Sequence, residues 1–75
     1  MVTFTLSANA SSTVLSDGRL VEGRVLDLDP MTANAAAEKA SGTLYALSAD
    51  RSAGQWTFAH ANNAQTDRTF AVIFA

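Results

Sequence analysis

The sequence predicts a mostly β fold: a small antiparallel sandwich or barrel of five to six strands with one short α-helix at about residues 30–40. Apolar and polar residues alternate in several short stretches, which is typical of half-buried strands. Turn-forming residues separate these stretches, and one alanine-rich stretch has helical character. No internal repeat or long linker divides the 75 residues, so we expect a single β-rich domain, 1–75.

The first strand is predicted at the N-terminus, where Val2, Phe4 and Leu6 alternate with small polar residues and therefore share one face. Polar residues 7–12 are expected to form a connection. A hairpin is then predicted around Asp17-Gly18, because this dipeptide suits the positive-φ positions of a tight turn.

The return strand of this hairpin is predicted to run from Leu20 to about Leu28, with Gly23 as a bulge or a close backbone contact. Asp29-Pro30 is expected to end that strand and to begin the helix, since aspartate accepts from first-turn amides and proline suits the first helical position. The alanines favour a helix to about residue 40. Gly42 suits the left-handed position after it. The small helix face predicts close packing against a sheet or a second subunit.

The second half of the chain predicts three more strands. Residues 43–49 alternate, with Leu44 and Ala46 opposite Tyr45 and Leu47. Residues 50–54 are expected to form a loop that leads into a strand at 55–60. The last strand, 68–75, is apolar on both faces: Phe70, Val72 and Phe74 on one, Ala71 and Ile73 on the other. Such a strand must be covered on both faces.

Composition narrows the function. The formal net charge is −2 and the five basic residues are scattered, which argues against a nucleic-acid surface. The chain has no cysteine, and no apolar run is long enough for a signal peptide or a membrane span, so we expect a cytoplasmic protein without disulfides. A core of this size supplies only about 3–5 kcal/mol, so self-association or docking on a larger surface is expected.

Three patterns could carry chemistry. His60 is the single histidine, and no nucleophile motif accompanies it, so we expect neither catalysis nor a cofactor. Asp27 and Asp29 share one side of an extended segment and could hold a cation, but their expected roles are to close the strand and to cap the helix. Trp56 and Phe58 share a face with His60 and could stack bases, yet core packing is the favoured interpretation because basic neighbours are missing.

A partner surface is therefore the expected functional feature. It is predicted at the chain ends and at the loop that contains Arg51, with Val2, Phe4, Arg51, Ile73 and Phe74 as candidate interface residues. A concave site is not expected, because side chains should fill so small a sheet and leave no cavity of several hundred cubic ångströms.

Residues 3–10, Thr-Phe-Thr-Leu-Ser-Ala-Asn-Ala, resemble the opening of small head-decoration and head-fibre proteins of tailed bacteriophages. The cysteine-free β build, rich in serine, threonine, alanine and asparagine, is similar to theirs along the whole chain. The resemblance implies a cement role: a homo-oligomer, most simply a trimer, made in the host cytoplasm, that binds the major capsid protein on the virion surface. It carries no site residues.

Two other functions stay open at the level of sequence. The first is a small acidic cytoplasmic binding module, such as an enzyme inhibitor or a regulatory subunit. The second is a single-strand nucleic-acid binder of the OB type, which only the aromatic face at Trp56 and Phe58 supports.

Overall fold

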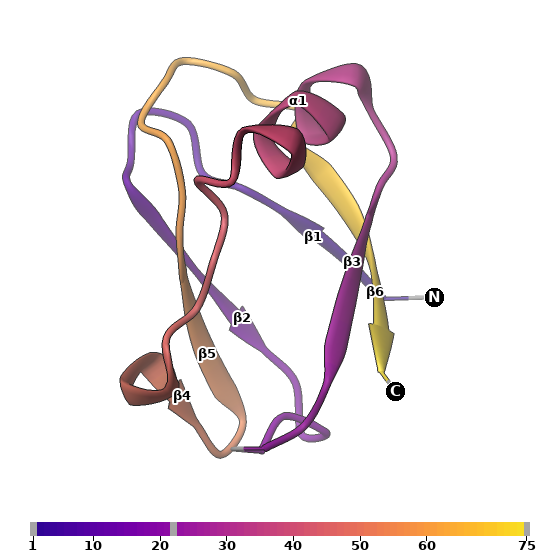
Figure 1. Ribbon diagram of the computed structural model, residues 1–75, viewed down its shortest axis with the longest axis vertical. Coiled ribbons are helices and arrows are strands. Elements are labelled where there is room, and N and C mark those ends of the chain that lie inside the picture. The colour runs from indigo at the N-terminus through magenta and orange to yellow at the C-terminus, as the bar shows by residue number, and fades with distance from the viewer. Residues whose placement is uncertain (1, 22, 75) are drawn as a thin grey trace.

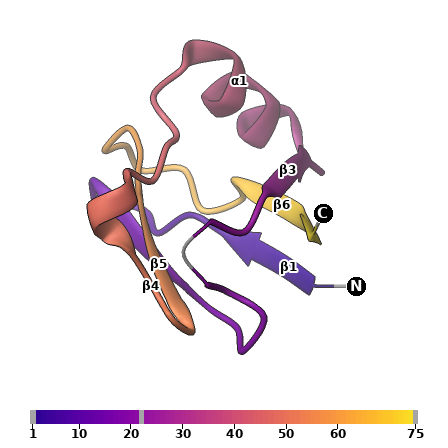
Figure 2. The same ribbon diagram turned by 60° about the horizontal axis from the view of Figure 1, so that its bottom comes forward.

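The computed structural model describes residues 2–21 and 23–74, which form two three-stranded antiparallel sheets and one α-helix (Figure 1). The first sheet has the order β1-β6-β3, with bounds Val2–Thr5, Thr69–Phe74 and Leu26–Pro30. The second has the order β2-β5-β4, with bounds Ser12–Ser16, Gln55–Ala59 and Arg51–Ser52. Helix α1, Ala33–Ser41, lies over one end of the first sheet, beside β3 and β6 (Figure 2). The predicted mostly β class with one short helix is confirmed.

The core lies between the two sheets, which do not close into a barrel. β1 and β6 contribute Phe4 and Phe70, and β5 contributes Trp56 and Phe58. The Phe4 and Phe58 ring centroids are 5.3 Å apart, so the aromatic rings join the sheets directly. Leu20, from the loop after β2, is also fully buried.

The last strand is central in its sheet, between β1 and β3. Phe70 and Val72 are buried against the second sheet, whereas Ile73 points outward and stays 48% exposed. The neighbours β1 and β3 carry polar residues on that outer face, among them Asp27 opposite Ile73. β6 itself ends at Phe74, and Ala75, where the strand was predicted to end, lies outside the described residues.

The predicted hairpin at Asp17-Gly18 is wrong. The turn exists, since the Leu20 amide donates to the Asp17 carbonyl at 3.0 Å, but β2 pairs with β5 and the return segment joins the other sheet as β3. The Asp17 side chain accepts from the Arg19 amide at 2.9 Å and holds the turn, so Gly18 does not adopt a positive φ. Burial of Leu20 then directs the chain into the core and away from β2.

Gly23 has a φ of 85° in a turn closed by the Arg24 amide on the Val21 carbonyl. A Cβ at this glycine would meet nothing within 4 Å, so the alternative of a close backbone contact is wrong. The predicted return strand was also expected to include Glu22, which lies outside the described residues. Gly23 thus supplies a turn conformation, and β3 begins only at Leu26.

The helix begins later than predicted. Pro30 is the last residue of β3, and Thr32 caps the helix by accepting from the Ala35 amide at 3.1 Å. β3 continues through Asp29 because its partner β6 extends alongside it, and the amide of Met31 still donates to the Thr69 carbonyl. Pro30 costs no ladder bond, since its nitrogen faces the unpaired side of this edge strand. The predicted C-terminal glycine is confirmed: Gly42 has a φ of 76°.

The predicted strand at 43–49 is only in part correct. Leu44 and Ala46 face inward and Tyr45 and Leu47 outward, as the alternation indicates, but only Tyr45 forms a bridge, to Ala59. A 3-10 helix at Ser48–Asp50 follows, and the predicted loop at 50–54 contains β4 and a tight turn to β5. The Arg51 guanidinium explains the irregular path, because it binds the Ala46 carbonyl and folds the segment back on itself.

Candidate functional site

A groove of about 430 Å³ lies between β3 and the segment that runs from Leu44 to Arg51. One wall is residues 23–28, the other is Leu44, Tyr45, Ala46 and Arg51, and Trp56 and Phe58 of β5 form the floor. The expectation that side chains would leave no such cavity is wrong. The sheets join only through their cores and remain apart on this side, so the space between their edges is not filled.

The floor of the groove is aromatic and rigid. Trp56 and Phe58 point inward from β5 with ring centroids 6.3 Å apart, and Leu28 of β3 faces them. The Trp56 indole N–H is buried, and within the described residues it has no hydrogen-bond acceptor. The floor therefore consists of packed aromatic rings, of which only a small apolar area is exposed in the groove.

Positive charge gathers around the groove. Arg24, Lys39 and Arg51, three of the chain's five basic residues, line it, and Asp27 is the single acid among the described lining residues. Lys39 Nζ donates to the Leu28 carbonyl at 2.7 Å and pairs with Asp27 at 3.2 Å. The described lining is thus cationic, although the whole chain has a formal net charge of −2.

Arg51 is held in the groove wall by its own chain. Its Nε and Nη2 both donate to the Ala46 carbonyl, at 3.0 and 2.7 Å, and its guanidinium lies 4.7 Å from the centroid of the Trp56 ring. The predicted role, a loop-tip arginine that reaches freely across an interface, therefore changes: Arg51 presents its charge from a fixed position beside Trp56.

The groove also exposes an open strand edge. β3 pairs with β6 on one side only, and the Met31 amide bonds to Thr69, so odd-numbered residues of β3 face β6. The backbone groups of Leu26 and Leu28 consequently point away from β6, toward the groove. Lys39 takes up the Leu28 carbonyl, and within the described residues the amides of both leucines have no strand partner.

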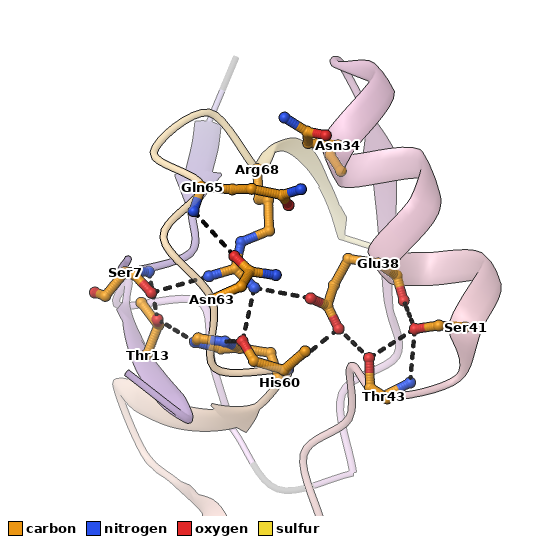
Figure 3. A network of polar contacts seen from close by, with 12 residues as sticks. Ser7, Thr13, Asn34, Glu38, Ser41, Thr43, His60, Asn63, Gln65 and Arg68 are labelled. Carbon is orange, nitrogen blue, oxygen red and sulfur yellow. Dashed lines mark hydrogen bonds and ion pairs between the residues drawn. The ribbon is translucent and has the colours of Figure 1, made fainter. Parts of the chain in front are cut away.

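A second polar cluster is buried where α1 meets the loops after β1 and β5 (Figure 3). Arg68 and Glu38 form an ion pair of 2.8 Å, with side chains 0% and 3% exposed. Arg68 also donates to the carbonyls of Ala61 and Ser7, at 2.8 and 3.0 Å. This one side chain therefore links the helix, the loop after β5 and the loop after β1.

Both carboxylate oxygens of Glu38 are occupied. Oε1 accepts from Arg68, and Oε2 accepts from the Thr43 hydroxyl and from the Ala61 amide. Burial raises the pKa of this carboxyl, but the hydrogen bonds from Thr43, Arg68 and Ala61 outweigh burial, so the pKa lies below its usual value. Glu38 is thus a buried, charged structural anchor that is bonded through both of its oxygens.

His60 lies beside this cluster and is equally engaged. Its Nε2 is 2.7 Å from the Thr13 hydroxyl, and its Nδ1 is 2.9 Å from the Ala61 carbonyl. A neutral ring that donates from Nδ1 to Ala61 and accepts at Nε2 satisfies both contacts. The Thr13 hydroxyl also accepts from the Ser7 amide, so it is committed to holding the loop between β1 and β2.

The predicted interface residues do not form one surface. Phe4 belongs to the core, and Val2 is half-buried beside it. Ile73 points outward from the first sheet, whereas Phe74 packs partly on the core under Arg19, whose guanidinium is 4.0 Å from the ring centroid. Ile73 is the most exposed of these apolar candidates.

Sequence reasoning missed Arg24 and Lys39. Arg24 follows the Gly23 turn, and its guanidinium also lies near the Phe74 ring, at 5.5 Å from the centroid. The two residues are 15 positions apart in the sequence and meet at the groove only because α1 folds back over β3. The spacing of the charges contains no signal that would have brought them together.

Comparisons with known proteins give no relative: no protein-family model, no curated protein and no solved structure matches this chain. Among the described residues, no helix is long and apolar enough to span a membrane. Asp27 and Asp29 are both exposed residues of β3, and in the described part of the chain they gain no further histidine or carboxylate to complete a metal site.

Proposed function

We propose that this chain is a non-catalytic structural interaction protein that binds and stabilises a larger protein assembly. The observation that carries the proposal is the apolar mouth of the groove. Val25, Tyr45 and Leu47 are 64%, 51% and 60% exposed, and two of them line the groove directly. Large apolar side chains gathered at a concave site mark a surface that a partner covers.

The assembly that the sequence favours is the head shell of a tailed bacteriophage. The resemblance in residues 3–10 falls on β1 and the loop after it, and it implies a trimeric cement protein on the capsid surface. A chain without disulfides in which charged residues make up 16% of the sequence suits a permanent place on a protein surface.

The polar residues support a binding role over catalysis or base stacking. Glu38 and Arg68 pair with each other, and His60 contacts the Thr13 hydroxyl and the Ala61 carbonyl, so these polar groups are committed to structural contacts. Trp56 and Phe58 are 2% and 6% exposed, so their ring faces are occupied by the core and do not offer a stacking platform.

Co-sedimentation with empty head shells of the encoding phage tests the proposal. We expect the chain to pellet with the shells, and Val25→Ser together with Tyr45→Ser, both in the groove lining, to weaken binding about tenfold or more, because apolar contact area is lost. Val14→Ser is the matched control, since Val14 is 51% exposed on β2 and does not line the groove. A chain that stays in the supernatant overturns the capsid assignment.

A further inference from the structure

The groove combines three features that a partner can contact: unpaired backbone amides, an aromatic floor and positive charge. The amides of Leu26 and Leu28 point into it without a strand partner, Trp56 and Phe58 form its floor, and cationic side chains stand around it. A partner in extended conformation satisfies all of these at once. Its backbone can pair with β3, and alternate side chains can reach the floor.

The charge of the groove lining determines which extended segments it favours. The described lining carries Arg24, Lys39 and Arg51 against Asp27 alone, so an occupant with carboxylates is favoured over a neutral or basic one. Asp27 and Asp29 face the outer side of β3, so carboxylates are disfavoured on that side of an added strand. The favoured occupant therefore directs its acidic and apolar side chains inward and small polar ones outward.

A second copy of this chain does not meet these demands. Its only acidic strand is β3, with Asp27 and Asp29. If two β3 strands paired with their leucines inward, the aspartates of one copy would lie opposite those of the other, and like charges directly opposite in a sheet are destabilising. The remaining edge strands, β1, β2 and β4, carry no acidic residue.

We infer that the groove binds an extended acidic segment of a partner protein, which adds as a strand to the free edge of β3 and places carboxylates near Arg24, Lys39 and Arg51. This inference rests on the proposed function, because it specifies how the interaction protein holds its partner. Backbone pairing supplies affinity, and the apolar floor and the cations select the side chains.

The probe is the blocked peptide glutamate-threonine-valine-threonine-glutamate, titrated into the full chain labelled with ¹⁵N. In an added strand its two glutamates and its valine share the inward face. We expect a dissociation constant of about 1 mM or tighter, with the largest shifts at the amides of Leu26 and Leu28 and at the Trp56 indole N–H. The same peptide with lysine in place of glutamate should bind about tenfold more weakly or not at all.

Two further controls make the test decisive. N-methylation of the peptide backbone on the edge that pairs should abolish binding, since it removes the ladder and keeps the charge. Arg24→Gln should weaken binding several-fold, whereas Arg19→Gln should not, because both arginines contact Phe74 and only Arg24 lines the groove.

Three outcomes would overturn the inference: no binding of the acidic peptide, equal binding of the N-methylated peptide, or displacement of the peptide by dodecanoate at equal concentration. The last would make the groove a site for small amphipathic anions. Head-shell co-sedimentation is independent of this titration. If the chain pellets with shells but does not bind the peptide, the groove assignment fails and the proposed function stands. If it binds the peptide but does not pellet with shells, the groove assignment stands and the capsid assignment fails.

Discussion

Arg68 joins three separate parts of the chain through its guanidinium. It is fully buried, pairs with Glu38, and donates to backbone carbonyls of two separate loops. A buried charge is costly to desolvate, and this cost is offset only while every partner is in place. Arg68 and Glu38 therefore act as one unit that fixes α1 against the loops after β1 and β5.

Removal of one charge of this pair should strongly destabilise the protein. We expect Glu38→Gln to lower the free energy of unfolding by about 3–5 kcal/mol, because Arg68 is left charged in a dry site. The double variant Glu38→Leu with Arg68→Met should be more stable than Glu38→Gln, since no buried charge remains. Asp27→Asn, which breaks the exposed pair with Lys39, should cost less than about 1 kcal/mol. Urea denaturation measures all three; similar costs for Glu38→Gln and Asp27→Asn would contradict the expectation.

Acid should weaken the fold through the same carboxylate. The pKa of Glu38 is lowered from the usual 4.5, and hydrogen bonds from the side chain and then the amide of Arg19 lower the pKa of Asp17 from 3.8 to about 2. A depressed folded-state pKa stabilises the native state above the ordinary pKa, and this contribution is lost as the pH falls toward the folded value. The free energy of unfolding should therefore fall between about pH 5 and pH 2.

Urea denaturation across that pH range, on the parent chain and on Asp17→Asn, separates the two groups. Asp17 lies on the surface, so its removal should leave most of the slope, which belongs to Glu38. A flat profile in the parent chain would show that neither carboxylate is coupled to folding.

Among the secondary-structure elements, local motifs form the turns and strand ends that they favour, but the strands beside them pair differently from the prediction. Asp17 builds a turn with its own side chain, yet the flanking strands join different sheets. Asp29 and Pro30 end a strand as predicted, but Thr32 caps the helix because β6 extends the pairing of β3 up to that point. A motif determines the conformation of about four residues, and the nearest available strand determines where the element lies.

The glycines provide a test of this distinction. Gly42 ends α1 with a φ of 76°, a conformation that costs an alanine about 1 kcal/mol or more. Gly18 lies outside the positive-φ region, and a Cβ there meets nothing within 4 Å. We expect Gly42→Ala to destabilise by that amount and Gly18→Ala to be neutral or slightly stabilising. Thermal and urea denaturation of the two variants compare them directly, and equal losses would show that the Gly18 turn is strained after all.

At the scale of the whole molecule, the outer face of the first sheet is the second surface available to a partner. Ile73 is 48% exposed there, in the central strand of its sheet, although a strand with apolar residues on both faces is expected to be covered on both. Ile73 does not line the groove, so a contact centred on Ile73 can join copies of the chain while the groove holds a partner protein.

We therefore expect the chain to self-associate through the face that carries Ile73. Ile73→Ser should weaken self-association and leave the fold intact, because Ile73 is outside the core. The adjacent Val72→Ser should instead lower stability by about 1–3 kcal/mol, since Val72 is buried between the sheets. Sedimentation equilibrium at micromolar concentration, with circular dichroism as the fold control, separates these effects. A parent chain that is monomeric and thermally stable would contradict the expectation.

The alternation of apolar and polar residues is enough to locate most strands and to orient their side chains. Alternation identified β1, β5 and β6, and it placed Trp56 and Phe58 inside. The same alternation separated Leu44 and Ala46 from their exposed neighbours, although no regular strand forms there. These features follow from the period of two, a property of neighbouring residues that needs no knowledge of the rest of the chain.

Only the tertiary structure decided which strands pair, where the groove opens and which charges are buried. β1 meets β6 across almost the whole chain, and Glu38 meets Arg68 from 30 residues away. Neither Arg24 nor Lys39 differs in its local sequence from an ordinary surface cation, yet both reach the groove because α1 and the Gly23 turn bring them to the same edge. Pairing and burial depend on the free energy of the whole assembled core, which no local pattern contains.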